Sequence, residues 1–148
     1  MNLTKIPGSD RVARYVPYGR LRTDADGNVL GILLTAFQLR SDETDGLSVT
    51  WLEFFGTNYT VCMTEVDRRM RARMNVARKA EYAIAVVQAI YDAARERGHK
   101  VRVIHDPEEG NEAHVSILRY PAADEMFLQA LADSVFISRE PCVQYDGR

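Results

Sequence analysis

One long apolar stripe constrains the fold of this 148-residue sequence more than any other feature. After Asn58, apolar side chains recur at spacings of four, three, four, four and three residues. They are Tyr59, Met63, Val66, Met70, Met74 and Ala77. This periodicity predicts an α-helix with one apolar face. Such a face is most often packed against the core of a domain, so the helix needs a sheet or another helix to cover it.

Segments with strand patterns occupy much of the remaining sequence. In residues 47–52 apolar and polar side chains alternate, which is the period of a strand entering a core. Acidic residues and a glycine at 23–28 lie between two extended segments and predict a hairpin turn. Further strands are predicted over residues 12–22, 101–105 and 113–120, and a helix from Pro121 with Met126, Phe127, Ala130, Leu131 and Val135 on its apolar side.

Residues 80–97 fit two structures. Their apolar side chains suit a helix with a polar side, but residues 82–87 also suit a buried strand, because short apolar runs do not distinguish the two. In either case Gly98 is predicted to end the helix, since glycine readily adopts the left-handed conformation found there. Strands and helices are mixed rather than strictly alternating, which predicts an α+β domain: one mixed or antiparallel sheet packed by two or three helices.

Length and composition indicate one globular domain. The chain is 46% hydrophobic and 27% charged, which is ordinary for a folded protein. We expect a flexible leader at residues 1–10, a single domain at 11–138 and a C-terminal tail at 139–148. No stretch approaches eighteen consecutive apolar residues, and the N-terminus lacks the apolar region of a secretory signal, so neither a membrane span nor export is expected. Two widely spaced cysteines, Cys62 and Cys142, are typical of a reducing cytoplasm.

Positive charge is concentrated in one segment. Six basic residues and no acid occur between positions 68 and 79: Arg68, Arg69, Arg71, Arg73, Arg78 and Lys79. We call these six residues the basic cluster. The whole chain has a formal net charge of -2, so the rest of it is acidic. A solvated helix face usually mixes both signs of charge, and this segregation therefore favours contact with an anionic partner.

The partner of the basic cluster is either a nucleic acid or an acidic protein. Arginines bind backbone phosphates through bidentate, salt-sensitive hydrogen bonds, and they also pair with the carboxylates of a protein partner. A sequence pI of about 5.9 argues against a protein that coats DNA over its whole surface, so any nucleic-acid contact must be local. A solvated face, with some charges neutralised by acids at positions 41–45, remains the alternative without function.

Two histidines are the candidate catalytic residues. If residues 101–105 and 114–118 form a hairpin, the simplest register sets His105 opposite His114, with both imidazoles on one face. With an arginine nearby, such a pair could cleave a phosphodiester without a metal: one histidine takes a proton and the other protonates the leaving oxygen. The alternative is that both histidines are structural. No spacing specifies further zinc ligands, so the sequence predicts no metal and no cofactor.

Two short segments of the sequence are similar to motifs of known enzyme families. The segment His114-Val115-Ser116-Ile117 resembles the H-x-S/T element of two-histidine phosphoesterases, a family that needs two such elements, and this sequence supplies one. Arg14 and the stretch Ser48-Val49-Thr50 resemble the arginine and S-T-S elements of the ADP-ribosyltransferase superfamily. No Glu-x-Glu motif follows on a later strand, so that resemblance is incomplete.

Three other stretches, at residues 47–55, 105–107 and 111–114, resemble small uncharacterised bacterial proteins encoded as stand-alone reading frames. The resemblance implies a bacterial cytosolic origin and an accessory role, and it assigns no catalytic residues. The leading hypothesis from the sequence is therefore a small binding protein that recognises an anionic partner through the basic cluster. The alternative is a ribonuclease-like phosphoesterase that uses His105 and His114. The sequence leaves the oligomeric state open.

Overall fold

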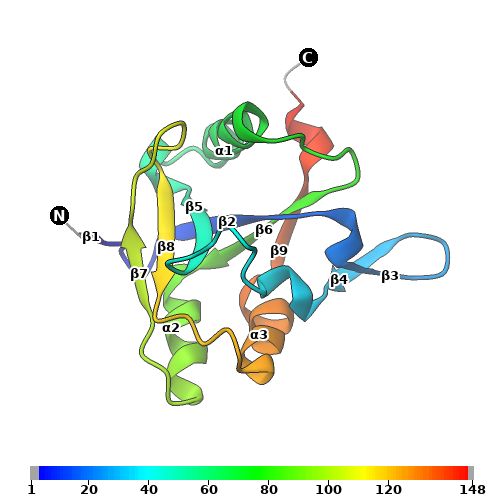
Figure 1. Cartoon of the computed structure of the whole chain (residues 1–148). Coiled ribbons are helices and arrows are strands. Elements are labelled where there is room, and N and C mark those ends of the chain that lie inside the picture. Colours follow the sequence, from blue (N-terminus) through cyan, green and yellow to red (C-terminus); the bar gives the residue numbers. More distant parts are fainter. Residues whose placement is uncertain (1–3, 147–148) are drawn as a thin grey trace.

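A seven-stranded antiparallel sheet separates one helix from two others, so the chain forms three layers (Figure 1). The computed structural model describes residues 4–146. Its helices are α1 (Tyr59–Arg73), α2 (Val87–Glu96) and α3 (Glu125–Ala130). The strands of the large sheet are β1 (Thr4–Lys5), β2 (Arg11–Val16), β5 (Leu47–Trp51), β6 (Glu81–Val86), β7 (Arg102–His105), β8 (His114–Leu118) and β9 (Ser138–Pro141). The predicted single α+β domain is confirmed.

The strands of the large sheet follow the order β1-β7-β8-β5-β2-β6-β9, and every neighbouring pair is antiparallel. A second, two-stranded sheet pairs β3 (Leu21–Thr23) with β4 (Val29–Ile32) and projects from the body as a hairpin (Figure 1). Its connection is the turn predicted at residues 23–28. There the Asp24 carboxylate accepts hydrogen bonds from the amides of Asp26 and Asn28.

Each face of the large sheet has its own apolar core. On one face, strand residues such as Val12, Val115 and Ile117 pack with α2, α3 and the short helix η2 (Leu34–Phe37). On the other face, Tyr15 and Tyr82 pack with α1 and the short helix η5 (Cys142–Tyr145). Strand side chains alternate between the faces, so the face that each residue occupies follows from its position in the strand.

Helix α1 begins where the sequence predicts it. The Asn58 side chain accepts a hydrogen bond from the Val61 amide and caps the first turn. Met63 and Val66 of the predicted stripe are fully buried against the sheet. The helix ends at Arg73, so Met74 and Ala77 lie in the connection to β6, and Met74 is 38% exposed.

Residues 80–97 adopt both of the structures that their pattern allows, one after the other. The first part forms β6, which lies between β2 and β9 and is buried on both faces, and α2 follows directly at Val87. Gly98 ends α2 with a positive φ of 78°, as predicted. The helix expected from Pro121 begins instead at Glu125, where the Asp124 side chain caps it, and Met126 is exposed rather than buried.

Both ends of the described chain belong to the sheet. The expected leader contributes β1, which pairs with β7, and Ile6, which is 3% exposed. The expected tail contributes β9, which pairs with β6, and Cys142, which is fully buried in the core beneath α1. The sheet and its cores thus extend beyond the boundaries expected at residues 10 and 139; positions 1–3 and 147–148 lie outside the described residues. Ile6 and Cys142 are isolated apolar residues, so they produce no periodic pattern from which their burial could be predicted.

Candidate functional site

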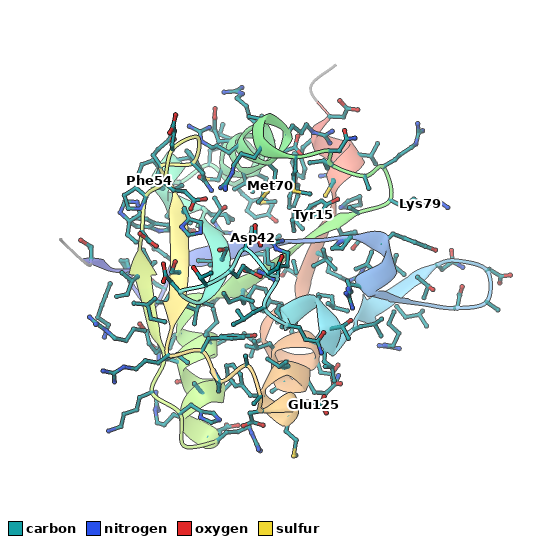
Figure 2. The ribbon with its side chains drawn as sticks, in the orientation of Figure 1. Tyr15, Asp42, Phe54, Met70, Lys79 and Glu125 are labelled. Atoms are coloured by element: carbon teal, nitrogen blue, oxygen red, sulfur yellow. The ribbon has the colours of Figure 1, made fainter. Side chains whose placement is uncertain are left out.

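A pocket of about 340 Å³ lies between the C-terminal half of α1 and the sheet. Figure 2 shows Met70 of α1, Tyr15 of β2 and Asp42 together in this region. We call it the α1 pocket. The remaining lining residues are Arg14, Arg40, Ser48, Val49, Thr50, Arg73, Met74, Glu108, Asn111 and His114. The α1 pocket therefore joins one helix, three strands and the loops at residues 38–46 and 106–113.

The floor of the α1 pocket is polar because β5 and β8 present polar side chains to the face that carries α1. In the antiparallel register Thr50 pairs with His114, and Ser48 pairs with Ser116. The residues between them, Val49 and Val115, point to the opposite face and are buried in its core. The alternation seen in the sequence thus places hydroxyl groups and an imidazole side by side under α1.

His114 is held in one orientation and turns one nitrogen toward the α1 pocket. Its side chain is only 8% exposed. Nδ1 lies 2.8 Å from the Asp106 carbonyl oxygen, so Nδ1 carries the proton and donates. Nε2 has no hydrogen-bond partner within residues 4–146. Only two side-chain N or O atoms of residues 4–146 are both inaccessible and without a partner, Thr35 Oγ1 and Arg69 Nε. His114 Nε2 is not one of them, so it is accessible from the pocket.

The hydroxyl groups beside His114 also retain hydrogen-bonding capacity. The Asn111 side-chain amide donates to Thr50 Oγ1 over 3.1 Å, which leaves the hydroxyl hydrogen of Thr50 free to donate elsewhere. Asn111 is itself fixed, because its carbonyl oxygen accepts from the Ala113 amide. Ser116 donates to the Asp106 carboxylate and is already satisfied. The floor therefore offers a donor at Thr50 and an acceptor at His114.

Arg14 lines the α1 pocket and forms a buried ion pair with Glu43 behind it. Arg14 and Glu43 have side chains that are 3% and 2% exposed, and the guanidinium binds both carboxylate oxygens. Strands β2 and β5 pair only at two positions, and the Arg14 side chain lies where they diverge. Its remaining donors bind the carbonyl oxygens of Ala36, Ser48 and Gln38. Every donor of this guanidinium is satisfied, so Arg14 holds the wall.

Glu43 ties the loop at residues 38–46 to the sheet. Its carboxylate accepts from the backbone amides of Arg40 and Ser48 as well as from Arg14. Burial alone would raise the pKa of this carboxyl, but the Arg14 guanidinium and the two amides outweigh burial and leave the pKa below its usual value. The carboxylate is thus charged and fully engaged.

Two partly exposed arginines stand at the α1 pocket. The Arg40 side chain is 48% exposed, and its Nε lies 3.6 Å from Asp42 Oδ1 and 3.5 Å from Glu43 Oε1. These separations exceed those of a good hydrogen bond, so Arg40 is loosely held. The Arg73 side chain is 43% exposed and pairs with Glu108, which is 37% exposed. Because exposed ion pairs contribute little free energy, an incoming anion can compete for both guanidinium groups.

The predicted histidine pair is not formed. Strands β7 and β8 set His105 opposite Val115, and His114 lies opposite Asp106 instead. The register is shifted by one residue from the expected one, so the two imidazoles point to opposite faces of the sheet. His105 packs its ring on Trp51 and Phe54, with centroids 5.2 and 5.5 Å away, and its Nε2 lies 2.7 Å from the Glu112 carbonyl oxygen. The prediction that both histidines share a face is wrong.

Most of the basic cluster is neutralised by carboxylates of the same chain. Arg68 and Arg69 bind Glu65, and Arg69 also binds Glu112 and stacks on the Phe55 ring at 4.4 Å. Partial burial would lower the pKa of Arg69, but hydrogen bonds to the two glutamates raise it overall, and Arg69 lowers the pKa of Glu112. Arg69, with a side chain 19% exposed, is therefore part of the folded framework.

Arg71 has a similar internal role. Its guanidinium donates to the buried Asp67 carboxylate at 2.6 Å and to the Cys142 carbonyl oxygen at 3.0 Å. The hydrogen bond to Asp67 raises the pKa of Arg71 above its ordinary value. Asp67 also accepts from the Tyr82 hydroxyl, so the arginine links α1 to β6 and to the C-terminal segment. Arg69 and Arg71 are therefore both engaged within the fold.

Arg78 and Lys79 carry the unneutralised charge of the cluster. Both are exposed, and neither pairs with a carboxylate within the described range of 4–146. Lys79 lies over the Tyr18 ring with its nitrogen 5.2 Å from the centroid, and Figure 2 shows it projecting from the body of the molecule. Arg68 is paired, but its side chain is 66% exposed. The accessible cations are thus Arg68, Arg73, Arg78 and Lys79.

Several pocket residues escape analysis of the sequence. Asn111 and Arg40 lie in loops, where no periodicity reveals which side chains converge. Ser48 and Thr50 did give a signal, because they are the polar half of an alternating strand. The strand order that sets them beside His114 has no local signature, since β5 and β8 are far apart in the sequence.

Comparison of this chain with protein-family models, with curated proteins and with solved structures finds no match. The residues of the α1 pocket therefore have to be interpreted from their own chemistry. Within the described range no three His, Cys, Asp or Glu side chains are grouped so that they could hold a metal ion. No helix of that range is long and apolar enough to cross a membrane.

Proposed function

We propose that this chain is a small binding protein that recognises an anionic partner through the exposed members of the basic cluster. The observation that carries this proposal is the charge at Arg78 and Lys79, which no carboxylate among residues 4–146 neutralises; they lie five and six residues after the exposed Arg73 at the end of α1. Basic side chains gathered on an otherwise acidic chain attract anions locally, because the rest of the surface repels them. Arg69 and Arg71 support this surface from within the fold rather than contacting the partner.

Single-stranded nucleic acid suits this surface better than an acidic protein. Each exposed cation can contact a different phosphate of the strand. Such contacts do not depend on the base sequence of the nucleic acid. Arg73 belongs both to the basic cluster and to the α1 pocket, so a strand bound along the cluster passes a cavity. The cavity is too small for a protein element wider than a side chain or for a duplex.

The two-histidine phosphoesterase has no geometric support. Its mechanism requires two imidazoles at one phosphate, and the register turns His105 and His114 to opposite faces. We therefore favour a binding function over catalysis. We also propose that the protein works in a reducing cytoplasm, which the free, buried thiols of Cys62 and Cys142 support. Burial raises the pKa of the Cys142 thiol to about 12, so this sulfur is unreactive.

The test is a titration of labelled single-stranded RNA and DNA by fluorescence anisotropy at several salt concentrations. We expect affinity to fall as salt rises, with a log–log slope of about 0.7 per phosphate contacted. The triple variant Arg68→Gln, Arg78→Gln, Lys79→Gln removes three exposed cations and should reduce the slope by about 2.

A matched control changes three exposed cations elsewhere on the chain, Arg22, Arg95 and Lys100, to Gln, which alters net charge equally. If both triple variants weaken binding to the same extent, the effect is one of net charge and the assigned surface is wrong. An acidic peptide, such as a glutamate decamer, serves as the competing partner. Binding of the peptide with no binding of either nucleic acid would overturn the preference for nucleic acid.

A further inference from the structure

We infer that the α1 pocket accepts a single nucleotide, either free or as one residue of a bound strand. This inference rests on the proposed function only for the strand; a free nucleotide would bind without it. The volume of about 340 Å³ lies at the small end of the range of roughly 300–1,000 Å³ that ligand sites span. A nucleotide combines an anion, a flat ring and hydrogen-bond donors, and the pocket has a counterpart to each of these.

The anionic group is matched by Arg40 and Arg73. Both are partly exposed. Arg73 pairs with the exposed Glu108, and Arg40 lies 3.5–3.6 Å from the exposed Asp42 and the buried Glu43, so a phosphate can replace Glu108 and Asp42 as their partners. Arginine is well suited to this exchange because its planar guanidinium binds two oxygens of one phosphate. The buried Arg14 does not take part, since all its donors are already bound.

The flat ring is matched by an apolar wall. Met70 and Met74 line the α1 pocket from the helix side, and Tyr15 lines it from the sheet side. Methionine side chains are flexible and polarisable, so they adapt to an aromatic ring inserted beside them. Tyr15 is fixed in place because its hydroxyl accepts a hydrogen bond from the Ala77 amide at 3.0 Å.

The edge of the ring is matched by the polar floor. With Nδ1 donating to Asp106, His114 Nε2 is an acceptor that has no partner among residues 4–146, on a side chain that is only 8% exposed, and an N–H or O–H donor of a ligand can pair with it. The Thr50 hydroxyl, which already accepts from Asn111, supplies a donor next to it. Bases carry donors and acceptors side by side on their edges, and buried polar atoms discriminate strongly against ligands that leave them unpaired.

Nucleoside monophosphates and inorganic phosphate are the probes. Backbone ¹H–¹⁵N spectra and the imidazole ¹⁵N signals of the full chain are recorded with each probe up to about 1 mM, within the range of weak ligand binding. We expect at least one nucleoside monophosphate to shift the signals of Thr50 and the Nε2 resonance of His114. Inorganic phosphate should leave both unchanged. Absence of these shifts with all four common nucleoside monophosphates, or equal shifts with phosphate, overturns the inference.

Variants locate the binding. His114→Gln and Arg73→Gln should each weaken nucleotide binding by about tenfold, the effect of losing one hydrogen bond or charged contact. The matched control is His105→Gln, which changes a histidine on the opposite face of the sheet and should stay within about twofold of the parent. Thermal melting checks that each variant is folded. Equal weakening by His105→Gln and His114→Gln would refute the assignment.

The oligonucleotide arm separates this inference from the proposed function. A bound single strand that shifts Thr50 and His114 supports both, and it shows that the pocket takes a nucleotide of the strand. A strand that binds without shifting them, when mononucleotides also fail, leaves the proposed function standing and refutes the pocket. If mononucleotides bind but the strand does not, the pocket assignment stands and the proposed function is refuted.

Discussion

Removing the charge of Glu43 should cost more stability than any comparable substitution on this chain. Glu43→Gln keeps the size of the side chain but leaves the Arg14 guanidinium buried without a counterion. One carboxylate oxygen becomes an amide nitrogen, so its N–H donors now face one Arg14 Nη and also the backbone amide of residue 40 or 48. Breaking a buried ion pair from one side costs about 3–5 kcal/mol, and each abandoned donor accounts for about 1–3 kcal/mol of that.

The assay is urea denaturation followed by far-ultraviolet circular dichroism. A loss of about 3 kcal/mol should also lower the melting temperature of a chain of this size by roughly 6–12 °C. The control is Glu53→Gln, which makes the same chemical change in a pair with Arg11 whose side chains are 32% and 20% exposed. That variant should lose about 1 kcal/mol or less.

A double-mutant cycle sharpens the test. Arg14→Met leaves the Glu43 carboxylate buried with two backbone donors, and it should be destabilising by a similar amount. The double variant removes both charges, so its cost should fall at least about 2 kcal/mol short of the sum of the single variants. A loss below about 1 kcal/mol for Glu43→Gln, or strict additivity in the cycle, would refute the view that this ion pair holds the wall of the pocket.

The dependence of the unfolding free energy on pH in the acid range tests the same ion pair. Because the pKa of Glu43 is lower in the folded chain than in the unfolded chain, its contribution is present above the unfolded value of 4.5. The contribution is lost as the pH falls through the folded pKa. Glu43→Gln should therefore show a shallower decline in stability below about pH 4.5 than the parent chain.

Three further predictions concern positions outside the pocket. Gly46→Ala would place a Cβ 2.2 Å from the Ile117 carbonyl oxygen, so it should lower the free energy of unfolding by about 1–3 kcal/mol or more in urea denaturation. The control Gly19→Ala, whose Cβ would have nothing within 4 Å, should leave stability unchanged. Asn58→Ala removes the cap of α1 and should lose about 1 kcal/mol by the same assay. Hydrogen bonds from Arg97 and His99 lower the pKa of Asp124, so its stabilising effect is present above the unfolded value of 3.8 and fades below it; Asp124→Asn should flatten the melting profile there.

Periodic features of the fold were predictable from the sequence, whereas long-range pairing was not. The stripe after Asn58 predicted α1, and the alternation in residues 47–52 predicted β5, since both patterns reflect which side chains are buried. The register of His105 and His114 depends on a single residue in the loop between them. There Glu108 and Asn111 form an isolated bridge that sets the spacing. A one-residue error in such a loop reverses the face of every side chain beyond it.

The basic cluster was predicted correctly as a concentration of charge but not as an exposed face. Arg69 and Arg71 find carboxylates at Glu112 and Asp67, one far away in sequence and one a helical turn earlier. Charge counts along a segment omit acids that folding brings from elsewhere. The α1 pocket was missed for the same reason, because its lining comes from segments scattered between residues 14 and 114.

The pairing of β9 with β6 has a consequence for aggregation. Strand β6 has the sequence EYAIAV, and five of its six residues are buried. Such a segment, rich in apolar residues that favour strands, readily joins identical segments of other molecules when its edge is free. The short β9, which carries Arg139 and ends at Pro141, occupies that edge and is itself a poor template for further strands. Loss of β9 by proteolysis would thus convert a protected strand into a seed for self-assembly.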